Sequence, residues 1–396
     1  MHDEIYNRRK VRLVNLVSFL MGFLDAFLIY ILSAYIAPLV GTERLGAFYF
    51  VTFSLVLLAL FFLQAFVRFL GKSRTLYLFL GITVVASAFL SSLPLSWLSL
   101  AILVLLIVAI NLTWVSLDIL LEGYSQDSVS GRVRGLYLTI MNLGLILAPF
   151  LSIKVLEKDT YAGIFFWLLV GYALVFTIAV LSFRNDNRVL LERIRLRTTF
   201  RKMLREKNLF HIYVVSFGMD FFYALFLVYM PLYLLGLGYS WNDLGIMFTL
   251  MLLPFILLQY PLGVLADRAY GEKELIALSL LITAGSCLAL GFSSGQSFLF
   301  VTLMLITTRV GIAGIEVLRD SYFYKQIDQS DADVIAFFRT TRSVANMVGA
   351  FISIALFLVF PLKSFLFLTA FVLLMSFISA LKLEDTQSEK EVLESA

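Results

Sequence analysis

Residues 309–322 read RVGIAGIEVLRDSY, and residues 111–124 read NLTWVSLDILLEGY. Both segments are apolar with two embedded acids, and an offset of 198 residues aligns them. At this offset Asp118 aligns with Glu316, and Glu122 aligns with Asp320. Two matching acids inside apolar segments are not expected by chance. The pair therefore predicts an internal repeat that divides the chain into two related halves.

Apolar runs of helical length surround these two segments. The chain is 61% hydrophobic and 15% charged, whereas soluble domains carry about 25% charged residues. A bilayer span needs ~20 apolar residues, and the runs are too long for strands and lack strict alternation. We predict an all-α integral membrane protein with twelve transmembrane helices in two pseudo-symmetric six-helix bundles. The predicted spans are 11–37, 46–67, 75–93, 98–124, 134–153, 161–183, 209–235, 244–266, 275–293, 298–324, 340–360 and 364–382.

The polar stretches set the domain organisation and the orientation. Of the 31 basic residues, 25 lie on the side of the N-terminus and the central linker, and four lie on the opposite side. Cytoplasmic loops carry the excess of Lys and Arg, so we expect a multi-pass protein of the cell (plasma or inner) membrane with both termini in the cytoplasm. The predicted parts are an N-terminal bundle, a basic linker, a C-terminal bundle and a cytoplasmic tail: 1–183, 184–207, 208–383 and 384–396.

Other classes of protein are disfavoured by what the sequence contains. The net charge of +4 follows from the topology, so no nucleic-acid partner is expected. One Cys and two distant His residues do not make a zinc site, and we expect no metal. A nucleotide-binding Gly-x-x-x-x-Gly-Lys loop is missing from the sequence, and so is a credible Ser/His/Asp set. We predict no cofactor and no enzymatic activity. No oligomeric state is specified, and a monomer is compatible with the sequence.

Three local motifs resemble those of the major facilitator superfamily. Residues 263–273, GVLADRAYGEK, are similar to the family's Gly-x-x-x-Asp-Arg loop. Residues 127–135, DSVSGRVRG, are similar to its acid-to-Arg-Gly signature, and residues 144–149, GLILAP, are a weakened form of the Gly-Pro motif of antiporters. The resemblance covers the whole chain, with six plus six spans and a basic central loop. It implies two bundles that move a small molecule by alternating access.

Six acids lie inside the predicted spans, and the bases Arg309 and Arg319 accompany them. A charge near the bilayer centre costs at least ~2.5–3.5 kcal/mol on insertion scales, so these side chains are expected to face protein or a water-filled cavity. The excess of acids favours a cationic, zwitterionic or amphipathic solute. Because a buried carboxylate can bind and release a proton as its solvent access changes, it also favours proton coupling.

We predict three groups of site residues. The solute is predicted to contact residues near the middle of the spans: Asn111, Trp114, Asp118, Arg309, Glu316, Tyr30 and Tyr223. Proton coupling is assigned to Asp25 and Asp220, with Asp25 preferred because its own span holds no base near it. Gating at the cytoplasmic mouth is assigned to Glu122, Asp127, Arg134, Asp267, Arg268, Arg319 and Asp320. For each group a static network of ion pairs and caps is the alternative.

The function predicted from the sequence is proton-coupled secondary transport, with export or antiport of a cationic or amphipathic solute preferred. One alternative is uptake of an anionic or zwitterionic solute bound by Arg309. A second is a non-transporting membrane receptor or scaffold of the same fold. The expected partners are a small-molecule substrate, protons and the lipid bilayer.

Overall fold

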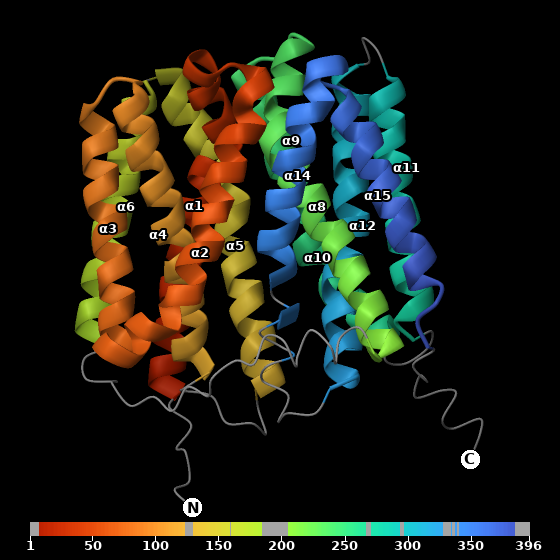
Figure 1. Cartoon of the computed structure of the whole chain (residues 1–396), viewed down its shortest axis with the longest axis horizontal. Helices are drawn as coiled ribbons and strands as arrows, with labels where there is room; N and C mark the ends of the chain where they lie inside the picture. The colour runs from red at the N-terminus through yellow and green to blue at the C-terminus, as the bar shows by residue number, and fades with distance from the viewer. Residues whose placement is uncertain are drawn as a thin grey trace, which may run out of the picture. The chain divides into compact units, whose positions relative to one another are not determined.

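The computed structural model describes residues 8–122, 130–158, 160–183, 205–266, 271–293, 297–327, 334, 337–338 and 340–384. Across these residues the chain is helical and forms no strand, which confirms the predicted fold class (Figure 1). A short 3-10 helix, η1 (Thr42–Arg44), precedes α2. The first set of spans is formed by α1 (Arg8–Val40), α2 (Leu45–Leu70), α3 (Lys72–Ser92), α4 (Trp97–Glu122), α5 (Ser130–Lys158) and α6 (Tyr161–Ser182). The second set is formed by α8 (Lys207–Gly236), α9 (Trp241–Leu250), α10 (Leu253–Leu265), α11 (Lys273–Phe292), α12 (Phe298–Lys325), α14 (Thr340–Val359) and α15 (Ser364–Ala380).

The helices have the length and surface of membrane spans. Within the described part of the chain, ten helices are long and apolar enough to cross a membrane, and two more apolar helices are shorter. Large apolar side chains remain exposed on them, for example Phe69 at 86% and Tyr260 at 79%. Water would not tolerate many such side chains, whereas lipid tails solvate them. The chain is therefore a multi-pass membrane protein.

The eighth predicted span is interrupted. Helix α9 ends at Leu250, a turn covers Met251 and Leu252, and α10 begins at Leu253 with Pro254 in its first turn. Proline has no N–H, so Pro254 cannot donate to the carbonyl four residues earlier, and its ring crowds that carbonyl. The sequence therefore breaks this span near its middle, although its hydrophobicity is continuous.

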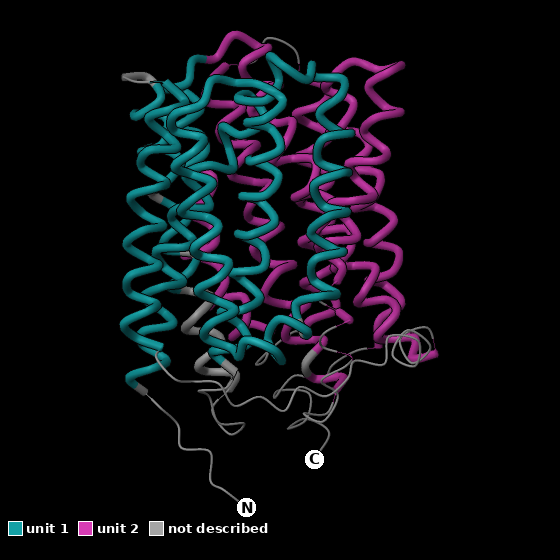
Figure 2. Tube along the Cα trace, turned by 60° about the vertical axis from the view of Figure 1, so that its left-hand side comes forward, with its two compact units in different colours: residues 1–192, 240–249 teal, residues 193–239, 250–396 magenta. Residues whose placement is uncertain are grey.

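The described helices fall into two compact units (Figure 2). Unit 1 comprises Met1–Glu192 with Ser240–Thr249, and unit 2 comprises Arg193–Tyr239 with Leu250–Ala396. Helix α9 thus packs with unit 1, although it follows α8 in the second set of spans. The domain boundaries 1–183 and 208–383 stay a prediction.

The same helix pairs pack together inside each unit. In unit 1, α1 packs on α5, α3 packs on α4 and α6, and α2 packs on α4. In unit 2, α8 packs on α14, α11 packs on α12 and α15, and α10 packs on α12. Each of these pairs in unit 1 has its counterpart at the same place in the order of spans in unit 2. The sequence repeat is therefore matched by a repeat in packing.

Helices α1 and α5 approach each other at the level of their backbones. A Cβ added to Gly144 would lie 2.3 Å from the carbonyl oxygen of Phe19, and one added to Gly22 would lie 2.7 Å from that of Met141. Real Cβ atoms do not approach an oxygen so closely, and a helix backbone cannot give way locally. Gly144, the first residue of the Gly-Pro-like motif, therefore permits this packing.

Replacing Gly144 by Ala is expected to lower the stability of the protein in detergent by about 1–3 kcal/mol, because overpacked interiors lose that much. Thermal unfolding of the purified variant measures the effect. Gly81→Ala on α3 is the matched control, since its added Cβ would meet Phe176 only at 3.8 Å. The control is expected to be neutral or stabilising, because Ala favours a helix over Gly by up to about 1 kcal/mol. Equal losses in both variants would contradict the packing argument.

Candidate functional site

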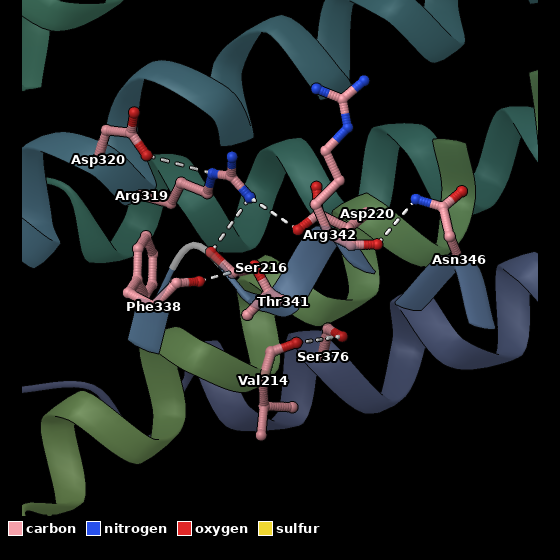
Figure 3. Close-up of polar contacts among 10 residues, drawn as sticks. All are labelled: Val214, Ser216, Asp220, Arg319, Asp320, Phe338, Thr341, Arg342, Asn346 and Ser376. Atoms are coloured by element: carbon pink, nitrogen blue, oxygen red, sulfur yellow. Dashed lines mark hydrogen bonds and ion pairs between the residues drawn. The ribbon is translucent and has the colours of Figure 1, made fainter. Parts of the chain in front are cut away.

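An ion-pair cluster lies between α8 and α12 in unit 2 (Figure 3). Nη1 of Arg319 lies 3.6 Å from Oδ2 of Asp220 and donates to Oγ of Ser216 at 3.1 Å. Nε of Arg319 lies 3.3 Å from Oδ1 of Asp320, its neighbour on α12. The side chains of Arg319 and Asp220 are 14% and 6% exposed, so this ion pair is largely removed from solvent. The structure thus brings together a predicted coupling residue and two predicted gating residues.

A third carboxylate extends this cluster toward α10. Oε2 of Glu316 accepts a hydrogen bond of 2.9 Å from Nε2 of Gln259. Glu316 also lies within electrostatic range of Arg319. Arg342 on α14 acts on Glu316 too, although the side chain of Arg342 is exposed. Three carboxylates therefore share the poorly exposed guanidinium of Arg319. A cluster of carboxylates of this kind can accept and release a proton.

Arg309 lies deeper in unit 2 and has different surroundings. The residue is 0% exposed, and its guanidinium carbon lies 4.4 Å from the ring centre of Phe226, 5.0 Å from that of Phe222 and 5.4 Å from that of Tyr223. Within the described residues, Nε, Nη1 and Nη2 have no hydrogen-bond partner. Removing an ion from water costs several kcal/mol even after relaxation, whereas one cation–π contact returns about 0.5–2 kcal/mol. Arg309 is therefore a stabilised but incompletely satisfied cation.

Unit 1 does not reproduce this arrangement at the aligned positions. Asn111, the counterpart of Arg309, donates from Nδ2 to the carbonyl of Ile107 in its own helix at 2.9 Å. Trp114 and Asp118 are half-buried on the same helix α4. The two halves thus share their helix packing but differ in charge at this depth.

Helix α1 supplies the remaining candidates of unit 1. Asp25 is half-buried, and the fully buried Tyr172 of α6 lies within electrostatic range of its carboxylate. Tyr30 is buried and stacks on Phe248 of α9, with ring centres 4.8 Å apart. A packing role also explains why Tyr30 is buried in a ring stack. A solute contact at Tyr30 stays a prediction.

Several predicted gating residues cannot be placed. Asp127, Asp267 and Arg268 lie outside the described residues. Glu122 ends α4, and Arg134 lies in the first turns of α5, but their side chains are not among those described. The gating role of these five residues stays a prediction.

One buried ion pair was not predicted from the sequence. Glu272 is 0% exposed, pairs with Lys325 and accepts a hydrogen bond of 2.7 Å from Oγ of Ser321. It joins the start of α11 to the end of α12 inside unit 2. Two signals were available, because Glu272 directly follows Gly271 of the Asp-Arg-like loop, and Ser321 and Lys325 are four residues apart on one helix face. Phe222 and Phe226 were missed as well, because nothing distinguishes them in sequence from the many other Phe residues.

The comparisons with known proteins agree with this architecture. The profile of the Major Facilitator Superfamily matches residues 14–247 and 240–396. A solved structure with a similar fold is the crystal structure of a POT family transporter in complex with 5-aminolevulinic acid. It is 12% identical, the alignment covers 95% of each chain, and the TM-score is 0.76. At this identity the likeness concerns the fold. A comparison with curated proteins found no match.

The family match and the fold support a secondary transporter of small molecules. Because the family profile covers nearly the whole sequence, the chain belongs to the major facilitator superfamily.

Proposed function

We propose that this protein is a proton-coupled secondary transporter that works by alternating access. The observation that carries the proposal is the cluster in unit 2, where Asp220, Glu316 and Asp320 surround the poorly exposed guanidinium of Arg319. If all three carboxylates were ionised, their charge would exceed the single charge of this guanidinium in a largely apolar region. Binding a proton removes part of this excess at a small structural cost.

Within this cluster, Glu316 is the carboxyl group best suited to hold the proton. Asp220 and Asp320 each form an ion pair with the guanidinium of Arg319. Glu316 instead accepts a hydrogen bond from the neutral amide of Gln259. A neutral donor stabilises a carboxylate less than a guanidinium does. We therefore add Glu316 to Asp25 and Asp220 as a proposed coupling residue.

The solute and the direction of transport are part of the proposal. The Gly-Pro-like segment 144–149 favours export or antiport, and the excess of acids favours a cationic or amphipathic solute. The alternative is an anionic or zwitterionic solute at Arg309. The surroundings of Arg309 support this alternative, because within the described residues its donors lack acceptors, while Asp220 and Glu316 have partners. The POT family transporter of similar fold is in complex with 5-aminolevulinic acid, a zwitterion.

Proton flux in liposomes tests the proposal. Purified protein is reconstituted around a pH-sensitive dye, and gradients of tetraethylammonium, succinate or 5-aminolevulinic acid are imposed in turn. At least one gradient is expected to move protons, and Glu316→Gln is expected to reduce that flux. Protein-free liposomes give the leak. Solute movement without any accompanying proton movement would contradict the coupling, and movement of none of the three solutes would favour a receptor or scaffold.

We also propose that both termini and the linker 184–207 lie in the cytoplasm of the cell. A fluorescent reporter that folds only in the cytoplasm is expected to be active when fused after residue 396 or inserted in the linker, because 25 of the 31 basic residues lie on that side. The same reporter inserted at Thr42–Arg44, between α1 and α2, is the control and is expected to be dark. A dark reporter at the C-terminus would reverse the topology.

A further inference from the structure

We propose that Arg309 and the rings of Phe222, Tyr223 and Phe226 form a binding site for a carboxylate attached to an apolar body. The inference deepens the proposed transport function, because it names the chemical class of the solute. Every residue of this site belongs to unit 2, with Arg309 on α12 and the three aromatic rings within about one turn of α8. We call these four residues the arginine cage.

The first step of the argument is that the cage supplies contacts but no acceptor. All three ring centres lie 4.4–5.4 Å from the guanidinium carbon. A ring stabilises a cation through its π electrons, yet it leaves the N–H groups of the guanidinium to find acceptors elsewhere. Across the described part of the chain these nitrogens find none. A guanidinium carries five N–H donors in a planar fork.

The second step is that the fork matches a carboxylate. Two parallel N–H groups of arginine bind both oxygens of a carboxylate, and such charge-assisted pairs are stronger than neutral hydrogen bonds. Among the described residues, the carboxylates inside α8 and α12 have other partners, since Asp220 and Asp320 pair with Arg319 and Glu316 bonds to Gln259. Cys287 of α11, a buried thiol, also lies within electrostatic range of Arg309. An external carboxylate would complete the site.

The third step concerns the body of the ligand and its path. Phe222 and Phe226 are buried at 0% and 1% exposure, so they present apolar walls next to the charge. Tyr223 is half-buried and is the most exposed of the four residues of the cage. A carboxylate with a flat apolar group fits these walls better than a small hydrated anion does. The cage therefore selects by charge at Arg309 and by shape at the rings.

The test uses the full-length protein in detergent, without any proton gradient. Benzoate is the probe, and benzyl alcohol and benzylamine are its neutral and cationic counterparts. Thermal unfolding of the parent protein is expected to shift upward with benzoate and not with the other two compounds. Acetate is expected to bind more weakly than benzoate. A parent protein that responds equally to benzoate and benzyl alcohol would overturn the inference.

Substitutions at Arg309 separate a binding role from a structural one. Arg309→Met is expected to weaken benzoate binding at least about tenfold, while the unliganded protein unfolds at the same or a higher temperature, because an apolar side chain replaces a buried charge that lacks hydrogen bonds. Arg309→Lys keeps the charge but loses the fork, so an intermediate affinity is expected. Arg342→Met, which removes an exposed arginine from α14, is the control and is expected to bind benzoate like the parent.

Two results would overturn the carboxylate site. One is unchanged benzoate binding in Arg309→Met. The other is failure of Arg309→Met to fold, which would make the guanidinium a structural element of unit 2. These outcomes are separate from the proposed coupling. Benzoate binding with no proton flux in liposomes would remove the coupling and keep the cage, and proton flux without benzoate binding would do the reverse.

Discussion

Replacing Asp25 by Asn is expected to abolish accumulation of solute driven by a pH gradient, while exchange between compartments of equal pH continues. Asp25 lies half-buried in α1, where the described base nearest in sequence is Arg12, more than three helical turns away. A carboxylate in such a place can bind a proton when its access to water changes. Asparagine has nearly the same shape but carries no titratable proton. The pH gradient therefore no longer acts on a titratable group at position 25, while the solute can still cross the protein.

Liposomes with and without an imposed pH gradient measure this effect, using whichever of the three test solutes moves protons with the parent protein. Glu43→Gln is the matched control, because Glu43 is an exposed acid of the same unit in η1, outside the spans. The control is expected to accumulate solute like the parent. If Asp25→Asn accumulates solute as well as the parent does, Asp25 is not the coupling residue. The acids of unit 2 would then be the proposed coupling residues.

Replacing Arg319 by Met is expected to cause the largest loss of stability of any single substitution considered for unit 2. Asp220 would then stay buried without the guanidinium with which it pairs. Breaking a buried ion pair by removing one partner typically costs about 3–5 kcal/mol, because an uncompensated charge remains. Thermal unfolding in detergent measures the loss. Arg342→Met removes an exposed arginine from the same unit and is expected to leave stability nearly unchanged.

Double substitutions show which carboxylate accounts for the stability lost when Arg319 is replaced. Asp220→Asn combined with Arg319→Met removes both charges, so most of the stability lost in the Arg319 variant is expected to return. Asp320→Asn combined with Arg319→Met is expected to recover less, since the Asp320 side chain is 37% exposed and water already solvates it. Losses that simply add in the first pair would show that Asp220 and Arg319 are not energetically coupled.

The sequence by itself determined the helical fold and its repeat. Twelve apolar runs of bilayer length permit only helices, because a single segment in lipid must satisfy its own backbone hydrogen bonds. Asp118 and Glu316 mark the same place in both halves, and the same helix pairs pack in each unit. The sequence also showed which spans contain charge, because an acid within an apolar run is recognised whichever way its helix is rotated. The break in the eighth span follows from Pro254, because proline lacks the backbone N–H that would continue the helix.

Only the tertiary structure decided which side chains meet. Arg319 and Ser216 are 103 residues apart, and Gln259 and Glu316 are 57 apart, so no helical period relates them. Asn111 and Arg309 occupy equivalent places in sequence, yet Asn111 bonds within its own helix while Arg309 lies among the rings of α8. The difference arises because contacts between helices depend on the rotation of each helix about its axis. That rotation is set by packing across the whole unit, as at Gly144 against Phe19, and not by any one segment.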